Sequence, residues 1–272
     1  MTTTLRPTAP ERRTADGHRA RTYDVCVNSR PVGSVEITTD RRFGPRYGRI
    51  ERLAIAGPDR RRGRGTVAAL AAEEVLRGWG CRQIAVTVPA GEEAALGLVR
   101  ALGYAERSRS MEKTLGTAPP LPGGVTVREL GAAEFPAWEA DAKAGYAQDW
   151  AENGLPEAVA RAKADRDHAT ALPAGPDTPG TVLRALTSGG QDVGTLWVAL
   201  KEDAGFVFLV KVGAAHRGRG HGRTLMRLAE RECLAAGART LGLHVFAANT
   251  PAVRLYDSLG YWPTAFHFYK PL

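Results

Sequence analysis

The sequence predicts an α/β protein made of two copies of one domain, each a central mixed β-sheet flanked by helices. Three observations lead to this prediction. The chain has 272 residues, roughly twice the length of a typical domain. Short segments of the first half recur in the same order in the second half. Strand-like apolar runs also alternate with helix-like amphipathic ones in the second half, the pattern of a sheet covered by helices.

Matched landmarks define the repeat. Arg62-Gly63-Arg64-Gly65 recurs as Arg217-Gly218-Arg219-Gly220, an offset of 155. Leu102-Gly103-Tyr104 recurs as Leu259-Gly260-Tyr261, an offset of 157. Because the landmarks keep their order with a slip of two residues, they indicate that a whole domain was duplicated.

The domain boundaries follow from composition. Residues 115–124 read LGTAPPLPGG, and so many Pro and Gly residues indicate a linker. We therefore expect a first domain at residues 21–114 and a second at 125–272. Residues 1–20 are rich in Thr, Pro and Arg, and we expect them to form a disordered tail.

Overall composition is that of an ordinary globular protein. No apolar run approaches the roughly 20 residues of a membrane span, and the first twenty residues lack the apolar stretch of a secretory signal. The scattered Cys26, Cys81 and Cys233 fit buried free thiols better than a disulfide framework or a zinc site. We therefore expect a cytoplasmic protein without a metal, as a monomer or a homodimer.

The net charge of +8 belongs to the N-terminal half. Lys and Arg outnumber Asp and Glu by eight within residues 1–122, and they are equal in number in the rest of the chain. Such a basic half suggests an anionic partner, which could be a nucleic acid, an acidic protein or a phosphorylated ligand. No helix-turn-helix, RRM or zinc pattern is recognisable, which disfavours nucleic acid.

The first elements of the second domain are predicted from turn and capping residues. A strand at Val125–Leu130 precedes a helix at Glu134–Ala144. A second helix is expected from Leu155 to about Asp167. Pro156 indicates its start, because proline is favoured in the first turn of a helix. Two strands separated by a glycine-containing turn come next, at Val182–Leu186 and Val193–Leu200.

The later elements form a strand–helix–strand–helix–strand series. The nearly continuous apolar run at Phe206–Val212 predicts a strand buried on both faces. Apolar residues at helical spacing predict a helix at Arg223–Ala236, and a strand follows at Leu241–Phe246. Asn249 resembles an N-cap and opens a helix to Ser258, and the chain closes with the strand Phe266–Tyr269.

A loop between a buried strand and a helix carries the main functional signal. From Val210 the chain reads VKVGAAHRGRGHGRTLM. Glycines let the backbone approach a ligand closely, and amides at a helix start favour phosphate. The loop lacks the context of a Rossmann fingerprint and the Gly-Lys-Ser/Thr of a Walker motif. It predicts a polyphosphate site without choosing among nucleotide, dinucleotide and coenzyme A, and a basic turn with packing glycines is the alternative.

Two motifs together resemble the Gcn5-related N-acetyltransferase (GNAT) family. Arg217-x-x-Gly220-x-Gly222 is similar to its Arg/Gln-x-x-Gly-x-Gly/Ala motif. The segment from Asn249 to Tyr261 is similar to its N-x-x-A-x-x-L-Y-x-x-x-G-F/Y signature. The resemblance covers essentially the whole C-terminal domain and implies a tandem GNAT fold that uses acetyl-CoA as acyl donor.

The resemblance also implies which residues bind the donor. In the family, the strand before the loop separates from the next strand, and the pantetheine arm pairs with its backbone; the loop amides hold the pyrophosphate. The residues implied are Val210, Lys211 and Val212 for the arm, Arg217, Gly218, Arg219, Gly220, His221, Gly222 and Arg223 for the pyrophosphate, and Asn249 as a further coenzyme contact besides its capping role.

Tyr256 occupies the position of the family's tyrosine that protonates the departing thiolate, so the resemblance implies a general acid. The general base is open. Many relatives carry an acid at about the position of Lys211, and this chain does not. His244 on the following strand is the main candidate, with His267 and Asp149 as others.

Acceptor contacts are expected from the first helices of the second domain, where two Trp, a Tyr and an acid cluster: Trp138, Tyr146, Asp149 and Trp150. These side chains could suit an amine-bearing ligand or could be plain core. The implied function is an N-acetyltransferase that acts on an amine of a small molecule, peptide or antibiotic. A non-catalytic acyl-CoA-binding module and a nucleic-acid-binding protein are the alternatives.

The N-terminal copy departs from the family pattern. At an offset of 157, Val99 stands opposite Tyr256 and Glu92 stands opposite Asn249. With the tetrapeptides aligned, Val67 takes the place of the last loop glycine. We therefore expect a domain that keeps the fold but has lost catalysis.

Overall fold

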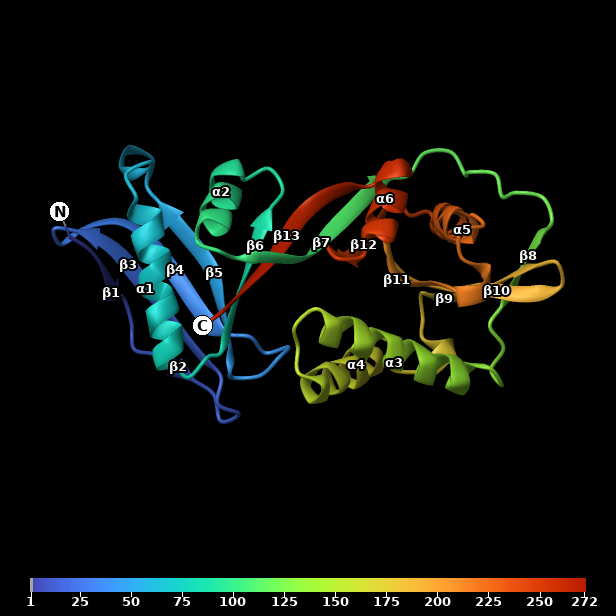
Figure 1. Cartoon of the computed structure of the whole chain (residues 1–272), viewed down its shortest axis with the longest axis horizontal. Helices are drawn as coiled ribbons and strands as arrows, with labels where there is room; N and C mark the ends of the chain where they lie inside the picture. The colour runs from blue at the N-terminus through green and yellow to red at the C-terminus, as the bar shows by residue number, and fades with distance from the viewer. Residues whose placement is uncertain (1) are drawn as a thin grey trace. The chain divides into compact units, whose positions relative to one another are not determined.

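The computed structural model describes residues 2–272 and divides them into two compact units (Figure 1). Unit 1 contains the chain up to Arg107 together with Ala265–Leu272, and unit 2 contains Ser108–Thr264. Each unit is a mixed sheet with helices packed on it, which confirms the predicted duplicated α/β fold.

Unit 1 contains six strands of its own repeat and two helices, and its sheet runs in the order β1-β3-β4-β5-β6, with β2 on β3. β5 and β6 are parallel and the other pairs are antiparallel. Its elements are β1 (Thr3–Pro7), β2 (Arg12–Arg13), β3 (Arg19–Val27), β4 (Arg30–Thr39), β5 (Tyr47–Ile55), α1 (Arg64–Gly78), β6 (Gln83–Pro89) and α2 (Glu93–Ala101).

The N-terminal segment is part of this sheet. β1 pairs with β3 over Thr3–Pro7, and β2 pairs with the start of β3. Leu5 packs against the core of unit 1. The expected disordered tail at residues 1–20 is therefore wrong for the described residues: a short edge strand needs few apolar side chains, because the backbone ladder of its neighbour supplies its hydrogen bonds.

Unit 2 has the strand order β8-β9-β10-β11-β12, in which only β11 and β12 are parallel. Residues 115–124, which lie within this unit directly before β8, contain neither helix nor strand. Its elements are β8 (Val125–Glu129), α3 (Phe135–Glu152), α4 (Glu157–Ala171), β9 (Thr181–Ser188), β10 (Gln191–Lys201), β11 (Ala204–Val212), α5 (His221–Ala235), β12 (Thr240–Phe246) and α6 (Thr250–Ser258).

Helices cover both faces of the sheet of unit 2. On β10, Leu196 and Val198 belong to the core that α5 covers. Trp197, between them, points to the opposite face and packs with Trp138 of α3. Alternate side chains of β10 therefore face α5 on one side of the sheet and α3 on the other, because successive side chains of a strand point to opposite faces.

A strand from the other repeat completes each sheet. β7 (Ala105–Thr114) follows α2 in the chain, yet its Ser108–Thr114 segment pairs with β12 of unit 2. β13 (Trp262–Pro271) follows α6, yet its Ala265–Pro271 segment pairs with β6 of unit 1. The boundaries expected at 21–114 and 125–272 therefore need correction, because composition marks a linker but does not show which sheet a strand joins.

Both exchanged strands use the same register. Lys113 of β7 lies opposite Leu241, and Lys270 of β13 lies opposite Ile84. Each pair maps onto the other at the offset of 157, so the exchange is reciprocal.

The three cysteines are buried, as the sequence predicts. Cys26, Cys81 and Cys233 are buried free thiols. Among residues 2–272, no helix combines the length and apolar character that crossing a bilayer requires. Within the same described part of the chain, no cluster of His, Cys, Asp and Glu is placed to hold a metal ion.

Candidate active site

The site in unit 2 begins where two parallel strands separate. β11 and β12 pair only from Ala204–Val207 to Thr240–Leu243, although β11 continues to Val212 and β12 to Phe246. A β-bulge against β10 leaves Phe208 without a cross-strand partner at this point, and bulges bend and twist the strand that carries them. The end of β11 therefore turns away from β12.

The glycine loop follows the separated end of β11. Gly218 and Gly220 have φ angles of 75° and 84°, in the left-handed region that favours glycine. Gly220 is the N-cap of α5 and supplies no capping side chain, so the first-turn amides have no intrahelical partner. A Cβ at Gly222 would lie 3.3 Å from Leu255 of α6 and 4.0 Å from Val212, so a larger residue there would crowd both.

The arginines of the loop have different surroundings. The Nε of Arg217 donates to the carbonyl of Val212 at 3.4 Å and ties the loop to the strand end. The Nη2 of Arg223 donates to Ser258 Oγ at 2.6 Å and links α5 to α6. Arg219 and His221 lie at the start of the helix, where Arg219 is exposed. Together these residues form a positively charged loop whose amides can bind an anion.

Tyr256 lies on α6, half-buried, with its ring 6.0 Å from that of Tyr261. Burial raises the pKa of the Tyr256 phenol to about 12, so the phenol is protonated at neutral pH. At the start of the same helix, Asn249 Oδ1 accepts the Ala252 amide at 3.2 Å. The predicted cap is thus confirmed.

Lys211 and Asp149 approach the site from two elements. Lys211 of β11 is ion-paired with Asp141 of α3. Burial and the nearby Glu152 raise the pKa of the Asp149 carboxyl, and Lys211 opposes this. The three carboxyl groups lie on α3, the helix that packs over this face of the sheet: Asp141, Asp149 and Glu152.

His244 is an exposed residue on β12. Its Nε2 lies 2.8 Å from Ser108 Oγ of the exchanged strand β7. Its ring is 6.5 Å from Phe246, and the Phe246 ring is 5.0 Å from Trp150 of α3. The histidine is thus oriented by a residue of the N-terminal repeat, which sequence analysis did not predict.

The aromatic cluster expected to contact an acceptor divides into core and polar residues. Trp138 and Trp150 are 8% and 7% exposed, and Trp138 packs against Trp197. Tyr146 donates to Asp167 Oδ2 of α4 at 2.9 Å. The structure therefore places Trp138 in the core, which is one of the two roles that the sequence left open for it.

Two aromatic residues were missed at this face. Phe206 and Phe208 are 37% and 46% exposed, and Phe208 stacks on Trp197 at 4.5 Å. The prediction that Phe206–Val212 is buried on both faces is wrong for these positions. Simple alternation does not give this result, because the bulge against β10 changes the faces: Val207 packs in the core under α5, whereas Leu209 packs with Trp197 on the opposite face.

His267, a candidate base for the C-terminal site, belongs to unit 1 instead. The exchanged strand β13 places its Nδ1 3.1 Å from Thr87 Oγ1 of β6. Burial, with smaller contributions from Arg42 and Arg49, lowers its pKa to about 4. His267 therefore belongs to unit 1, whereas Tyr256 and His244 belong to unit 2.

The loop of unit 1 aligns with that of unit 2 at an offset of 157. The helix N-caps are Gly63 and Gly220, both left-handed. Two residues earlier, Arg61 and Gly218 are also left-handed, with φ of 59° and 75°. The offset of 155 taken from the tetrapeptides is therefore wrong, because alternating Arg and Gly residues allow more than one register.

Gly65 is consequently the counterpart of Gly222. A Cβ at Gly65 would lie 3.6 Å from Leu98, and the corresponding contact of Gly222 is with Leu255, again 157 positions later. Val67, expected to obstruct a phosphate, lies farther along α1 and is 42% exposed. The loop of unit 1 therefore keeps the whole Arg-x-x-Gly-x-Gly pattern.

Comparison with known sequences identifies relatives of both halves. The model of the acetyltransferase (GNAT) family matches residues 2–104 and 134–261. Mycothiol acetyltransferase of Corynebacterium glutamicum is 40% identical over 77 residues, which make up 28% of this chain. The match spans 26% of that protein's length, about a quarter.

Two solved structures have a similar fold. A GCN5-related N-acetyltransferase from Sphaerobacter thermophilus aligns with a TM-score of 0.60 at 20% identity, over 92% of this chain and 80% of its own. A tandem GNAT protein from the clavulanic acid biosynthesis pathway aligns with a TM-score of 0.52 at 16% identity, over 93% of this chain and 83% of its own. The likeness is one of fold.

Proposed function

Because this chain belongs to the acetyltransferase (GNAT) family, we propose that it transfers an acetyl group from acetyl-CoA to an amine, and that the transfer takes place in unit 2. The observation that carries the proposal is the joint position of three features on one unit. They are the separated end of β11, the glycine loop after it, and the protonated phenol of Tyr256 on α6.

The residues fit the donor. The backbone of Val210, Lys211 and Val212 is not paired with β12 and can accept the pantetheine arm. The amides from Gly218 to Arg223 would hold the pyrophosphate, since they lie in a left-handed turn and at a helix start. Asn249 would contact the coenzyme as well as cap α6.

The transfer needs a proton donor at sulfur. The amine nitrogen attacks the thioester carbonyl carbon, the C–S bond breaks, and the sulfur leaves as a thiolate. Tyr256 donates a hydrogen bond to the developing thiolate and then its proton. The apolar surroundings that raise the phenol pKa also raise that of the departing thiol, so the proton can pass to sulfur.

The transfer also needs a base for the proton that the amine loses. We assign this role to His244, whose Nε2 is held at 2.8 Å from the Ser108 hydroxyl. Asp149 is the second candidate, because its raised pKa makes it a better base than an ordinary carboxylate. The variants His244→Ala and Asp149→Asn test the two candidates separately. Protonation of the base makes the rate fall toward low pH, so the base is the residue whose replacement removes this fall.

The acceptor is an amine of a small molecule, a peptide or an antibiotic. Asp149 on α3 offers a carboxyl group to an amine near this face, while Asp141 is already paired with Lys211, and the exposed ring of Phe208 offers an apolar contact. We propose Tyr146 and Trp150 as supports of this wall, since the ammonium of Lys163 lies over both rings. The buried thiols fit a cytoplasmic location, which remains a prediction.

The test is release of coenzyme A thiol by the full chain with acetyl-CoA and a panel of amines. We expect turnover that Gly222→Glu abolishes, because a side chain at this position crowds Leu255 and Val212 and adds a negative charge to the loop proposed to bind phosphate. Gly65→Glu, the matched change in unit 1, should leave turnover in place. Tight binding of acetyl-CoA without thiol release for any amine would instead identify a non-catalytic acyl-CoA-binding module, and salt-sensitive binding of DNA or RNA alone would identify a nucleic-acid-binding protein.

A further inference from the structure

Two exposed phenylalanine rings lie next to each other on β11 of unit 2. The ring centroids of Phe206 and Phe208 are 5.1 Å apart, and both side chains are exposed. One face of the Phe208 ring stacks on the buried Trp197, so the rest of its surface is turned away from the core. An exposed group of large apolar side chains, unlike a single one, indicates a surface that binds something.

The fold does not require aromatic residues at these two positions. At the offset of 157, their counterparts in unit 1 are Arg49 and Glu51. The strand registers agree, because Phe206 lies opposite Gly242 and Arg49 lies opposite Ala85. In unit 1 the two side chains form an ion pair, with 2.9 Å between Arg49 Nε and Glu51 Oε1. A charged pair is therefore compatible with the same backbone, and the two rings of unit 2 need another explanation.

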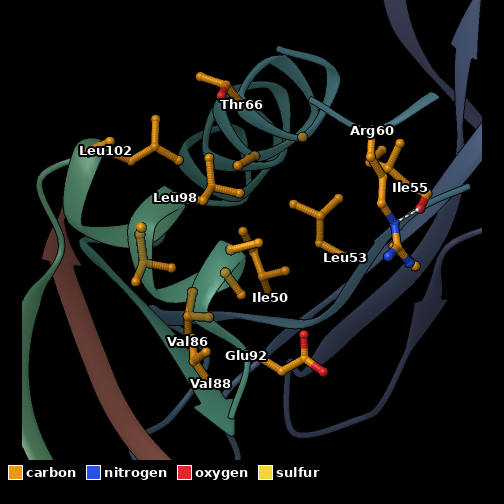
Figure 2. Close-up of a pocket in the computed structure, with 18 of the residues that line it drawn as sticks. Ile50, Leu53, Ile55, Arg60, Thr66, Val86, Val88, Glu92, Leu98 and Leu102 are labelled. Carbon is orange, nitrogen blue, oxygen red and sulfur yellow. Dashed lines mark hydrogen bonds between the residues drawn. The ribbon is translucent and has the colours of Figure 1, made fainter. Parts of the chain in front are cut away.

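The apolar side chains of the same two strands in unit 1 are turned to the helices. Figure 2 shows Ile50 of β5 and Val86 and Val88 of β6 lining a cavity of about 1260 Å³ together with Leu98 of α2. Ile50 and Val88 belong to the core that α1 covers. Arg49, the neighbour of Ile50, lies on the opposite face, because successive residues of a strand alternate. Unit 2 differs by having apolar rings on that opposite face.

A glycine leaves room beside the rings. Gly242 of β12 lies opposite Phe206, and a Cβ at Gly242 would be 3.4 Å from Cδ2 of that ring. Glu112 of β7 lies opposite Gly242 on its other side. Its neighbour Met111 packs in the core under α5, so alternation places Glu112 on the same face as the rings. A flat group can therefore lie over Gly242, between an aromatic ring and a carboxylate.

These residues lie beside the place proposed for the transfer. Phe208 is the bulged residue of β11, at the point where this strand leaves β12. The backbone proposed to bind the pantetheine arm begins two residues later, at Val210. His244, the proposed base, follows Gly242 by two residues, or about 7 Å at the usual rise of a strand. An amine near His244 would therefore be a short distance from a group that lies over Gly242.

We propose that the acceptor is an arylalkylamine, a primary amine joined to an aromatic ring by a short aliphatic linker, and that Phe206 and Phe208 determine this specificity. The inference rests on the proposed function, because it names the acceptor of the same site. The ring of the acceptor packs on the two phenylalanines over Gly242. Pairs of aromatic rings attract each other beyond the area that they bury, and the carboxylate of Glu112 favours a cationic ligand over an anionic one.

The chemical step is the transfer already described. The C–N bond forms between the amine and the thioester carbonyl carbon as the C–S bond breaks. The amine loses its proton to the base, and the sulfur takes the proton of Tyr256. The contribution of Phe206 and Phe208 is to place the amine for this attack by holding the ring behind it.

The test compares kcat/KM for 2-phenylethylamine and for butylamine, measured as thiol release by the full chain with acetyl-CoA. We expect a preference for 2-phenylethylamine of at least ~10-fold, because its ring adds both buried apolar area and aromatic contacts. Phe206→Arg combined with Phe208→Glu puts the residues of unit 1 at both positions and should remove this preference. Phe206→Tyr keeps the ring and should retain it.

A second variant leaves both rings in place. Gly242→Val fills the space over β12 and should lower kcat/KM for 2-phenylethylamine more than for butylamine. Ala85→Val, the matched change in unit 1, should leave both values unchanged. An unchanged far-UV circular dichroism spectrum would show that each variant folds.

Equal kcat/KM for the two amines would overturn the proposal and leave the proposed function in place, as would a preference that survives Phe206→Arg with Phe208→Glu. A wild-type dimer that this double variant converts to a monomer in size-exclusion chromatography would show that a second copy of the chain covers the rings, and would also overturn it. A chain that acetylates no amine would contradict the proposed function instead. Calorimetric titration with 2-phenylethylamine in the presence of coenzyme A then decides: binding that the double variant abolishes supports the ring site, and absence of binding rejects it.

Discussion

Units 1 and 2 share one backbone plan but differ in the residues that transfer requires. Both have parallel strands that separate after four paired residues, a bulge at equivalent positions, and a loop with two left-handed residues before a helix. Unit 2 adds Tyr256, α3 and α4, and unit 1 has Val99 and a short connection instead. The comparison shows that a repeat can keep the loop geometry of a binding site while it lacks the residues that transfer requires.

The packing around the exchanged strands has not diverged. In unit 1, Glu73 accepts from Lys270 at 2.8 Å and from Tyr104 at 3.0 Å. In unit 2, Glu230 accepts from Lys113 at 2.8 Å and from Tyr261 at 3.4 Å. The two buried clusters are related residue by residue at the offset of 157, so each exchanged strand brings the lysine that pairs with a buried carboxylate of the sheet it joins.

The largest expected effect comes from separating the two repeats. Residues 125–272 alone lack β7, which leaves the edge of β12 unpaired and Glu230 buried without Lys113. An unpaired edge and an uncompensated buried charge are both strongly unfavourable. We expect this fragment to aggregate or to lack a cooperative unfolding transition, and co-expression with residues 1–124 to restore a folded, active complex.

Size-exclusion chromatography and thermal unfolding followed by circular dichroism measure this outcome. A fragment 125–272 that is monomeric, unfolds cooperatively and releases thiol at the rate of the full chain would show that the reciprocal exchange is dispensable. The two repeats would then be independent domains.

Replacing the phenol of unit 2 is the sharpest test of the chemical difference. Tyr256→Phe should lower kcat by roughly 10²–10⁴, the usual contribution of a positioned acid, while acetyl-CoA affinity changes little. Val99→Tyr, the reverse change in unit 1, should create no activity in a Gly222→Glu chain, because the acceptor helices are also missing. Steady-state kinetics and calorimetry check both, and an unchanged kcat for Tyr256→Phe would leave the phenol a packing role only.

Local patterns predicted the elements well. Asn249 and Pro251 predicted the start of α6, and the structure has that cap with its hydrogen bond to the Ala252 amide. The two family motifs predicted the loop and the helix that carry the candidate site. Caps and periodicity are properties of neighbouring residues, so one sequence suffices to detect them.

The errors all concern non-local properties. β7 and β13 occupy equivalent positions in the two repeats, so sequence alone does not show which sheet each one joins, and His267 was assigned to the wrong unit. The exposure of Phe208 depends on a bulge relative to β10. Alternating Arg and Gly residues do not define the register between the two loops, and the N-cap positions of Gly63 and Gly220 do.

A matched pair of substitutions tests whether the two units depend equally on their buried clusters. Glu73→Gln and Glu230→Gln each remove the charge that pairs with a lysine. Glu73 and Glu230 side chains are 4% and 5% exposed, and the lysines are 24% exposed. Breaking a fully buried pair costs roughly 3–5 kcal/mol, and the partial exposure of the lysines reduces this to about 2–4 kcal/mol.

Urea unfolding of the full chain measures the free energy of unfolding for each variant. We expect losses of similar size, with unit 1 affected as much as unit 2. A loss confined to Glu230→Gln would show that unit 1 is the less tightly packed of the two units, and that only the packing of unit 2 has been retained.

The smallest expected effect is in the dependence of rate on pH, which separates the two titrating roles in unit 2. Burial raises the pKa of Tyr256 to about 12, so the phenol keeps the proton that it donates throughout the range below that value. An acid with a pKa of about 10, the ordinary value for tyrosine, would begin to lose activity near pH 9.

We therefore expect kcat to rise on the acidic side as the base and the amine lose their protons, and then to stay level through pH 10. Stopped-flow measurement of thiol release from pH 6 to 10, with buffer-only controls for thioester hydrolysis, follows this profile. A fall in kcat that begins near pH 9 would place the pKa of the donor at its ordinary value, and would contradict a phenol shielded by the residues around α6.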